Sequence, residues 1–218
     1  MSAVAGSLGK PKLRGVLHQA AFLVALPLAV ALVLAADGPR ARLGAGVFSV
    51  AVAACFGASA LYHRGNWKPT VRPWLRRIDH AGVFLLIAGS YTPVCLLTLS
   101  GVLPIVVLAI VWTGAIAAIV LKFVWIEAPK WVAAGIGIGL GWVAVVALPQ
   151  LVDRLSPAAV VLLMVGGIAY TAGAIIYARH RPDPIPSVFG YHELFHALTI
   201  VAVACQYTAI AVYVIRVA

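Results

Sequence analysis

The sequence predicts an all-α integral membrane protein, a bundle of seven transmembrane helices. Of its 218 residues, 63% are hydrophobic and only 10% are charged, whereas soluble domains average about 45–50% apolar and 25% charged residues. Apolar runs of roughly twenty residues, enough to cross a bilayer as a helix, recur along the chain. These runs are too continuous for the alternating strands of a membrane barrel. We therefore expect one transmembrane domain over residues 1–218, which leaves no room in this length for a soluble catalytic domain.

The spans follow from the apolar runs and from the turn-forming residues between them. Segments such as Asp37-Gly38-Pro39 and Arg181-Pro182-Asp183-Pro184 separate successive runs. We expect the spans at residues 16–36, 43–63, 78–99, 102–121, 131–149, 157–177 and 191–215. Residues 1–15 would then form a short cytoplasmic segment.

A cleavable signal peptide is the alternative interpretation of the first span. Lys10, Lys12 and Arg14 precede its apolar run, as basic residues do in signal peptides. The run is about twenty residues long, however, whereas the apolar region of a signal peptide has about 7 to 15. We therefore interpret the segment as the first transmembrane helix.

The basic residues indicate the orientation of the bundle. With the N-terminus in the cytoplasm, twelve Lys and Arg residues lie on the inner side and four on the outer side, as the positive-inside rule requires. The net charge of +10 then reflects topology and contact with anionic lipids. We expect membrane lipids as partners and no nucleic acid, and the sequence leaves the oligomeric state open.

The fifth span carries four glycines at every second position, Gly135, Gly137, Gly139 and Gly141. Small residues allow transmembrane helices to approach closely. We therefore expect close helix packing here, with a channel for a lipid or substrate beside this thin helix as the alternative.

Ionisable side chains inside a membrane indicate a functional site, and here they gather at three span ends. His63 ends the second span, Asp79 opens the third, and His192 and His196 open the seventh; the predicted topology puts all of them at the cytoplasmic end. His192 and His196 are four residues apart and share one helix face. With His63 they would form a three-histidine site that leaves one position of a tetrahedral Zn²⁺ open.

Asp79 and Ser59 are the candidate catalytic residues beside this zinc site. Asp79 could ligate the metal or take a proton from water next to it, and we favour the second role. Ser59 lies one helical turn from His63 and could support the site with its hydroxyl group. Interhelical hydrogen bonding without a metal is the alternative for these histidines. We expect His80 to serve packing or polar bridging, and His18 and His180 to be interfacial residues for which the sequence indicates no partner.

Three blocks of sequence carry a family resemblance: SALYH at residues 59–63, RIDHAGVFLLIAGSYTP at residues 77–93 and HELFH at residues 192–196. In order and spacing they resemble the bacterial hemolysin III family, part of the progestin and adipoQ receptor superfamily. The resemblance implies an adiponectin-receptor-like bundle in the bacterial inner (cytoplasmic) membrane, with a cytoplasmic N-terminus. By motif it also implies zinc on His63, His192 and His196, with the family's serine and aspartate at Ser59 and Asp79.

Three functions remain open at this stage. The leading hypothesis is a zinc-dependent hydrolase of a lipid amide or ester, because the resemblance links the superfamily to alkaline ceramidases. The second is a non-catalytic regulator of membrane lipid composition or energetics in which zinc staples the helices together. The third is an intramembrane metalloprotease, since residues 192–196 read His-Glu-x-x-His with Glu193 as the base. We do not predict a lytic toxin, because no amphipathic segment is available for insertion.

Overall fold

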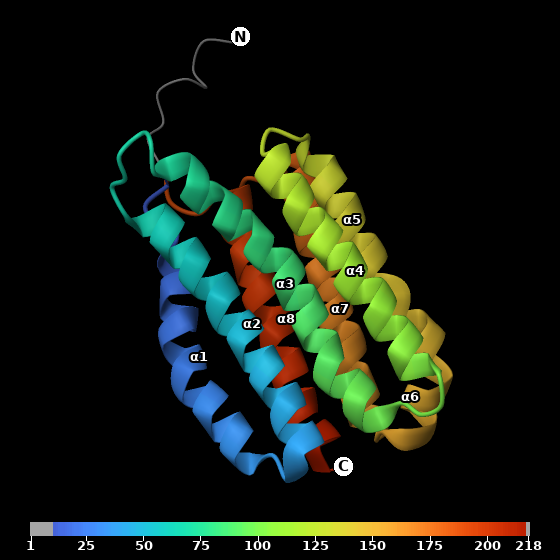
Figure 1. Ribbon diagram of the computed structural model, residues 1–218. Coiled ribbons are helices and arrows are strands. Elements are labelled where there is room, and N and C mark those ends of the chain that lie inside the picture. The colour runs from blue at the N-terminus through green and yellow to red at the C-terminus, as the bar shows by residue number, and fades with distance from the viewer. Residues whose placement is uncertain (1–10, 217–218) are drawn as a thin grey trace.

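The computed structural model describes residues 11–216, which are helical almost throughout. Seven stretches in this range are long and apolar enough to cross a membrane, which confirms the predicted seven-span bundle. The α-helices and 3-10 helices (η) are α1 (Val16–Ala35), α2 (Gly38–Arg64), α3 (Arg72–Thr98), α4 (Leu103–Val124), α5 (Lys130–Trp142), η1 (Val143–Ala147), α6 (Leu148–Arg154), α7 (Pro157–Arg179), α8 (Tyr191–Val212) and η2 (Val214–Arg216). Because the number of spans is odd, α1 begins at one end of the bundle and α8 ends at the other (Figure 1).

Local sequence explains where five of the helices begin and where α7 ends. Helices α2, α3, α4, α6 and α7 each have a proline in their first two positions, where the missing N–H would have no intrahelical partner. Ser156 caps α7 by accepting a hydrogen bond from the Ala159 amide. At its other end α7 stops at His180, which has the left-handed backbone conformation that terminates many helices.

Two helices extend further toward the membrane surface than the apolar runs predict. Helix α2 begins at Gly38 and α3 at Arg72, several residues before the predicted starts at 43 and 78. The added turns contain arginines whose side chains reach neighbouring backbone. Arg40 donates to the Leu96 carbonyl at 2.7 Å and Arg77 to the Phe123 carbonyl at 3.0 Å. Hydropathy underestimates such turns because long basic side chains can extend to polar surroundings.

The fifth span is a broken helix. The apolar stretch Lys130–Arg154 is divided into α5, η1 and α6, and Tyr91 of α3 bonds to the backbone at the break. Its hydroxyl lies 2.5 Å from the Gly141 carbonyl and accepts a hydrogen bond from the Ala144 amide at 2.8 Å. Broken helices are tolerated at membrane depth where a neighbour satisfies the freed backbone groups, and Tyr91 does so here.

The glycines of α5 do not serve close helix packing, so that prediction is wrong. A Cβ atom added at Gly135, Gly139 or Gly141 would meet no atom within 4 Å, and one added at Gly137 would meet only Ile87, at 3.7 Å. Gly137 and Gly141 instead line a cavity inside the bundle. The alternative of a channel beside this helix therefore agrees better with the structure.

The helices pack in antiparallel neighbours around a common core. Helix α2 lies against α1 and α3, and α7 lies against α8, which runs through the middle of the bundle in Figure 1. Phe48, Leu86 and Ile210 are among the largest fully buried side chains. Many large apolar side chains remain exposed on the outer faces, as expected for surfaces that contact lipid tails.

Candidate metal centre

Three helix ends deliver the predicted site residues to one end of the bundle. His63 lies in the last turn of α2, Asp79 in the first third of α3, and His192 and His196 in the first two turns of α8. His63 and His192 are 129 positions apart in the sequence. Antiparallel packing brings these helix ends together, so the site is a product of the fold.

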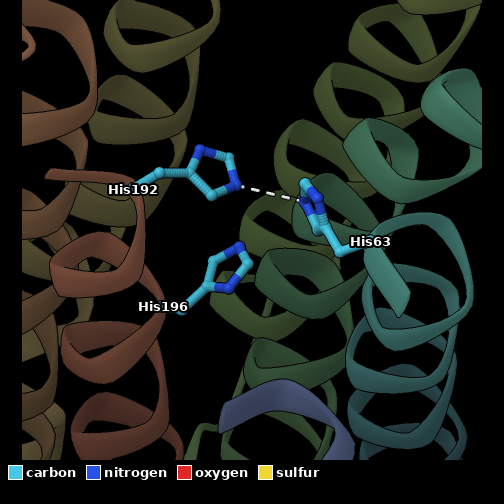
Figure 2. Close-up of side chains that lie close together, drawn as sticks. All are labelled: His63, His192 and His196. Atoms are coloured by element: carbon cyan, nitrogen blue, oxygen red, sulfur yellow. Dashed lines mark hydrogen bonds between the residues drawn. The ribbon is translucent and has the colours of Figure 1, made fainter. Parts of the chain in front are cut away.

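The three histidines converge on one point. One ring nitrogen from each of His63, His192 and His196 lies within 4.8 Å of the others, and all three side chains are buried. Figure 2 shows His192 and His196 projecting from one helix toward His63 on another. The Nε2 atoms of His63 and His192 are 3.1 Å apart. The spatial prediction made from the sequence, that these imidazoles meet, is confirmed.

The geometry of this cluster fits a small divalent cation. Two nitrogens bound tetrahedrally to one Zn²⁺ would be separated by about 3.3 Å, given Zn–N bonds of about 2.0–2.1 Å. The observed 3.1 Å between His63 and His192 is close to that value. Neutral imidazole nitrogens are common metal ligands, and this cluster could therefore hold a metal ion.

Asp79 and Ser59 lie beside the cluster. The Oδ2 atom of Asp79 is 3.5 Å from Nε2 of His63, and both side chains are buried. Ser59 is also buried, and among the described residues its hydroxyl has no hydrogen-bond partner. Both residues line the same cavity as His192 and His196. The carboxylate and the hydroxyl are therefore available to whatever occupies this cavity.

The carboxylate of Glu193 is buried and held by hydrogen bonds from Arg14 and Gly190. Its side chain is 0% exposed, its Oε1 atom accepts a hydrogen bond from Arg14, and its Oε2 atom accepts one from the Gly190 amide at 2.9 Å. The amide is at the N-terminus of α8, where a carboxylate commonly caps a helix. Glu193 thus ties the segment before α1 to the beginning of α8.

Sequence reasoning missed two residues of this region. His18, expected to be an interfacial residue without an identified partner, is buried and stacks on His196. Lys122, counted from the sequence as an inner-side loop charge, is buried in the last turn of α4 and lines the cavity. A usable signal existed for His18, because the predicted topology already put it at the same membrane end as His63. His80 is half-buried at the cavity wall and His180 is exposed.

An apolar cavity of about 210 Å³ extends from the histidine cluster into the bundle. It runs between α3, α5, α7 and α8 and passes the break in the fifth span. Its wall includes Val83, Ile87, Gly137, Met164 and Phe195. The polar groups of the site thus lie at one end of a space that suits hydrocarbon.

Fold and site together define a multi-pass helical membrane protein with a histidine cluster at one end of an apolar cavity. A family profile described as Haemolysin-III related matches residues 7–207. The chain is 31% identical over 171 residues to the hemolysin-3 homolog of Bacillus subtilis (strain 168), covering 78% of this chain and 77% of that protein. It is also 31% identical over 169 residues to hemolysin-3 of Bacillus cereus, covering 78% and 74%. The protein belongs to the hemolysin III family.

Proposed function

We propose that the protein is a zinc-dependent hydrolase that cleaves an amide or ester bond of a membrane lipid. The observation that carries this proposal is the convergence of three buried imidazoles within 4.8 Å at the end of an apolar cavity that Asp79 and Ser59 also line. The polar end can act on a carbonyl group while the apolar end holds an acyl chain. A lipid would enter sideways between the helices.

His63, His192 and His196 would hold the zinc ion. Bound there, the ion would polarise the substrate carbonyl and make water a better nucleophile at neutral pH. Three imidazole ligands leave room for substrate and water, as in catalytic zinc sites.

Asp79 would carry the proton in this reaction. Water forms a C–O bond to the acyl carbon, and its proton passes to the carboxylate of Asp79, which lies beside His63. As the C–N or C–O bond of the lipid breaks, Asp79 returns the proton to the departing amine or alcohol. The products are a fatty acid and the remainder of the lipid. Ser59 would hold the water or the carbonyl through its hydroxyl group.

The same observations favour a cytoplasmic position for the chemistry. The histidine cluster lies at the bundle end where α1 begins, and the charge count puts this end on the inner side. We propose the bacterial inner membrane as the location.

A non-catalytic regulator is the second candidate, and the packing of α2 and α8 supports it. Helix α2 packs mainly against α1 and α3, and α8 mainly against α7. A cation shared by His63, His192 and His196 would therefore join two helices that otherwise make little contact, and such a link stabilises a fold.

Glu193 gives no support to the metalloprotease alternative. A general base needs a carboxylate that can reach the water it activates. The carboxylate of Glu193 is fully buried and engaged by Arg14 and Gly190.

Metal analysis and lipid turnover of the purified protein in vesicles test the proposal. We expect about one zinc per chain and fatty-acid release from labelled lipid amides or esters, with release lost in His196→Ala. Asp79→Asn spares all three imidazoles, so zinc should remain bound while release is lost. His180→Ala, outside the site, is the matched control. One zinc per chain with no turnover of any lipid would favour the regulator and reject the hydrolase.

A further inference from the structure

His18 of α1 contacts the candidate metal centre through the face of its ring. The side chain is only 3% exposed, and its ring lies on that of His196 with a centroid distance of 3.8 Å and an interplanar angle of 13°. Phe56 of α2 also contacts His18, with ring centroids 4.9 Å apart. The imidazole of His18 is thus held beside a candidate ligand in a nearly parallel stack.

Among the described residues, Nδ1 of His196 has no hydrogen-bond partner of the kind that normally orients a ligand histidine. A metal-bound histidine almost always donates its second ring N–H to a carboxylate, a carbonyl or water, which fixes the ring orientation. The Nδ1 atom of His196 is buried and has no partner among the described residues. Ring contacts among the described residues are therefore the interactions that can orient this ring.

The stack with His18 can supply that orientation. The lone pair of an imidazole nitrogen lies in the plane of the ring. Rotation of the ring would therefore point the lone pair of the ligand nitrogen away from the ion. A flat ring at 3.8 Å blocks this rotation. Within residues 11–216, both ring nitrogens of His18 are buried and lack a hydrogen-bond partner. Its contact with His196 is therefore through the ring face.

The beginning of α1 is itself anchored to the elements that carry the ligands. Arg14 donates to Glu193 of α8. Gly15 has a backbone φ of +79°, and a Cβ atom added to it would lie 2.6 Å from Cβ of His63. The backbone amides of Lys12 and Leu13 bond to the Ser187 and Val188 carbonyls before α8. These contacts fix the position of His18 relative to the cluster.

We propose that His18 is a positioning residue of the metal centre, which fixes the ring plane of His196 by stacking. The inference rests on the proposed metal site and is independent of lipid hydrolysis. It assigns a role in the site to α1, a span for which the sequence motifs predict none.

Zinc affinity of the full chain in detergent micelles, measured by competition with a chelating dye, tests the role. His18→Leu fills the space but removes the flat ring, and we expect its affinity to fall about 10- to 100-fold, as on loss of other groups that orient ligands. His18→Phe keeps a flat ring without nitrogens, and we expect it to restore wild-type affinity. His180→Phe is the control for an exposed histidine. The absorption spectrum of bound Co²⁺ should change in His18→Leu and remain unchanged in His18→Phe.

Three results would overturn the proposal. His18→Leu could bind zinc as tightly as the wild type with the same Co²⁺ spectrum, which would show that the stack has no effect. His18→Phe could bind zinc as weakly as His18→Leu, which would show that the ring nitrogens of His18, and not its ring face, support zinc binding. The wild-type chain could bind neither metal. By contrast, zinc binding without lipid turnover would reject the hydrolase and leave this inference standing.

Discussion

Replacement of Glu193 by glutamine should destabilise the protein, because the carboxylate forms an ion pair in the interior. Glu193 is 0% exposed and its partner Arg14 is 22% exposed. Hydrogen bonds to charged groups contribute about 1.5–3 kcal/mol, and removal of one partner of a fully buried pair costs about 3–5 kcal/mol. Because Arg14 retains some contact with solvent, we expect Glu193→Gln to lower the free energy of unfolding by about 2 kcal/mol.

A double-mutant cycle isolates the interaction between these two residues. Arg14→Gln, Glu193→Gln and the double variant are unfolded by denaturant in detergent micelles at constant metal content. The coupling energy should reach about 1–2 kcal/mol, within the range for residues in direct contact.

A second ion pair at the same end of the bundle provides a matched control. Arg76 and Glu127 lie 2.6 Å apart, with side chains 34% and 72% exposed. Exposed pairs contribute about 0–1 kcal/mol. The cycle built from Arg76→Gln and Glu127→Gln should therefore give a smaller coupling energy than the pair of Arg14 and Glu193.

Two outcomes would refute the assignment of Glu193 as a structural residue. In one, its coupling with Arg14 is no larger than that of the exposed pair. In the other, Glu193→Gln abolishes lipid hydrolysis while the free energy of unfolding and the zinc content stay at wild-type values. The second outcome would mark Glu193 as a reacting group and revive the metalloprotease hypothesis.

Further predictions concern the metal, the beginning of α1 and the cavity. Removal of the metal with a chelator should lower the unfolding temperature, since a ligand that binds only the folded state stabilises it. In His63→Ala, the unfolding temperature should be the same with and without added metal. Gly15 and Gly38 both have φ of +79°, but an added Cβ atom meets His63 only at Gly15. Gly15→Ala should therefore weaken zinc binding. Gly38→Ala should leave zinc binding unchanged and lower the free energy of unfolding by about 1–2 kcal/mol through backbone strain. Equal zinc affinities of the two variants would contradict this prediction. Gly137→Leu would place a side chain into the cavity and should slow hydrolysis of long-chain lipids more than short-chain lipids, while unchanged chain-length preference would argue against an acyl site there.

The sequence alone determined the seven spans, because the thickness of the hydrocarbon layer fixes how many apolar residues a helix needs. It also determined that His192 and His196 share a face, since the helical repeat sets that relation locally. The predicted topology further placed His63, Ser59 and Asp79 at the same membrane end as this pair. All of these follow from rules that act within one helix or at a membrane boundary.

Only the tertiary structure decided how the helices meet. The stack of His18 on His196, the pairing of Arg14 with Glu193, the burial of Lys122 and the open space beside the α5 glycines depend on contacts between separate helices. The sequence carries little periodic signal for such contacts, because lipid-facing and helix-facing surfaces are both apolar. Tyr91 likewise meets the broken fifth span only because α3 packs beside it. Rules that act within one helix thus identified the candidate ligands, and interhelical packing determined which side chains surround them.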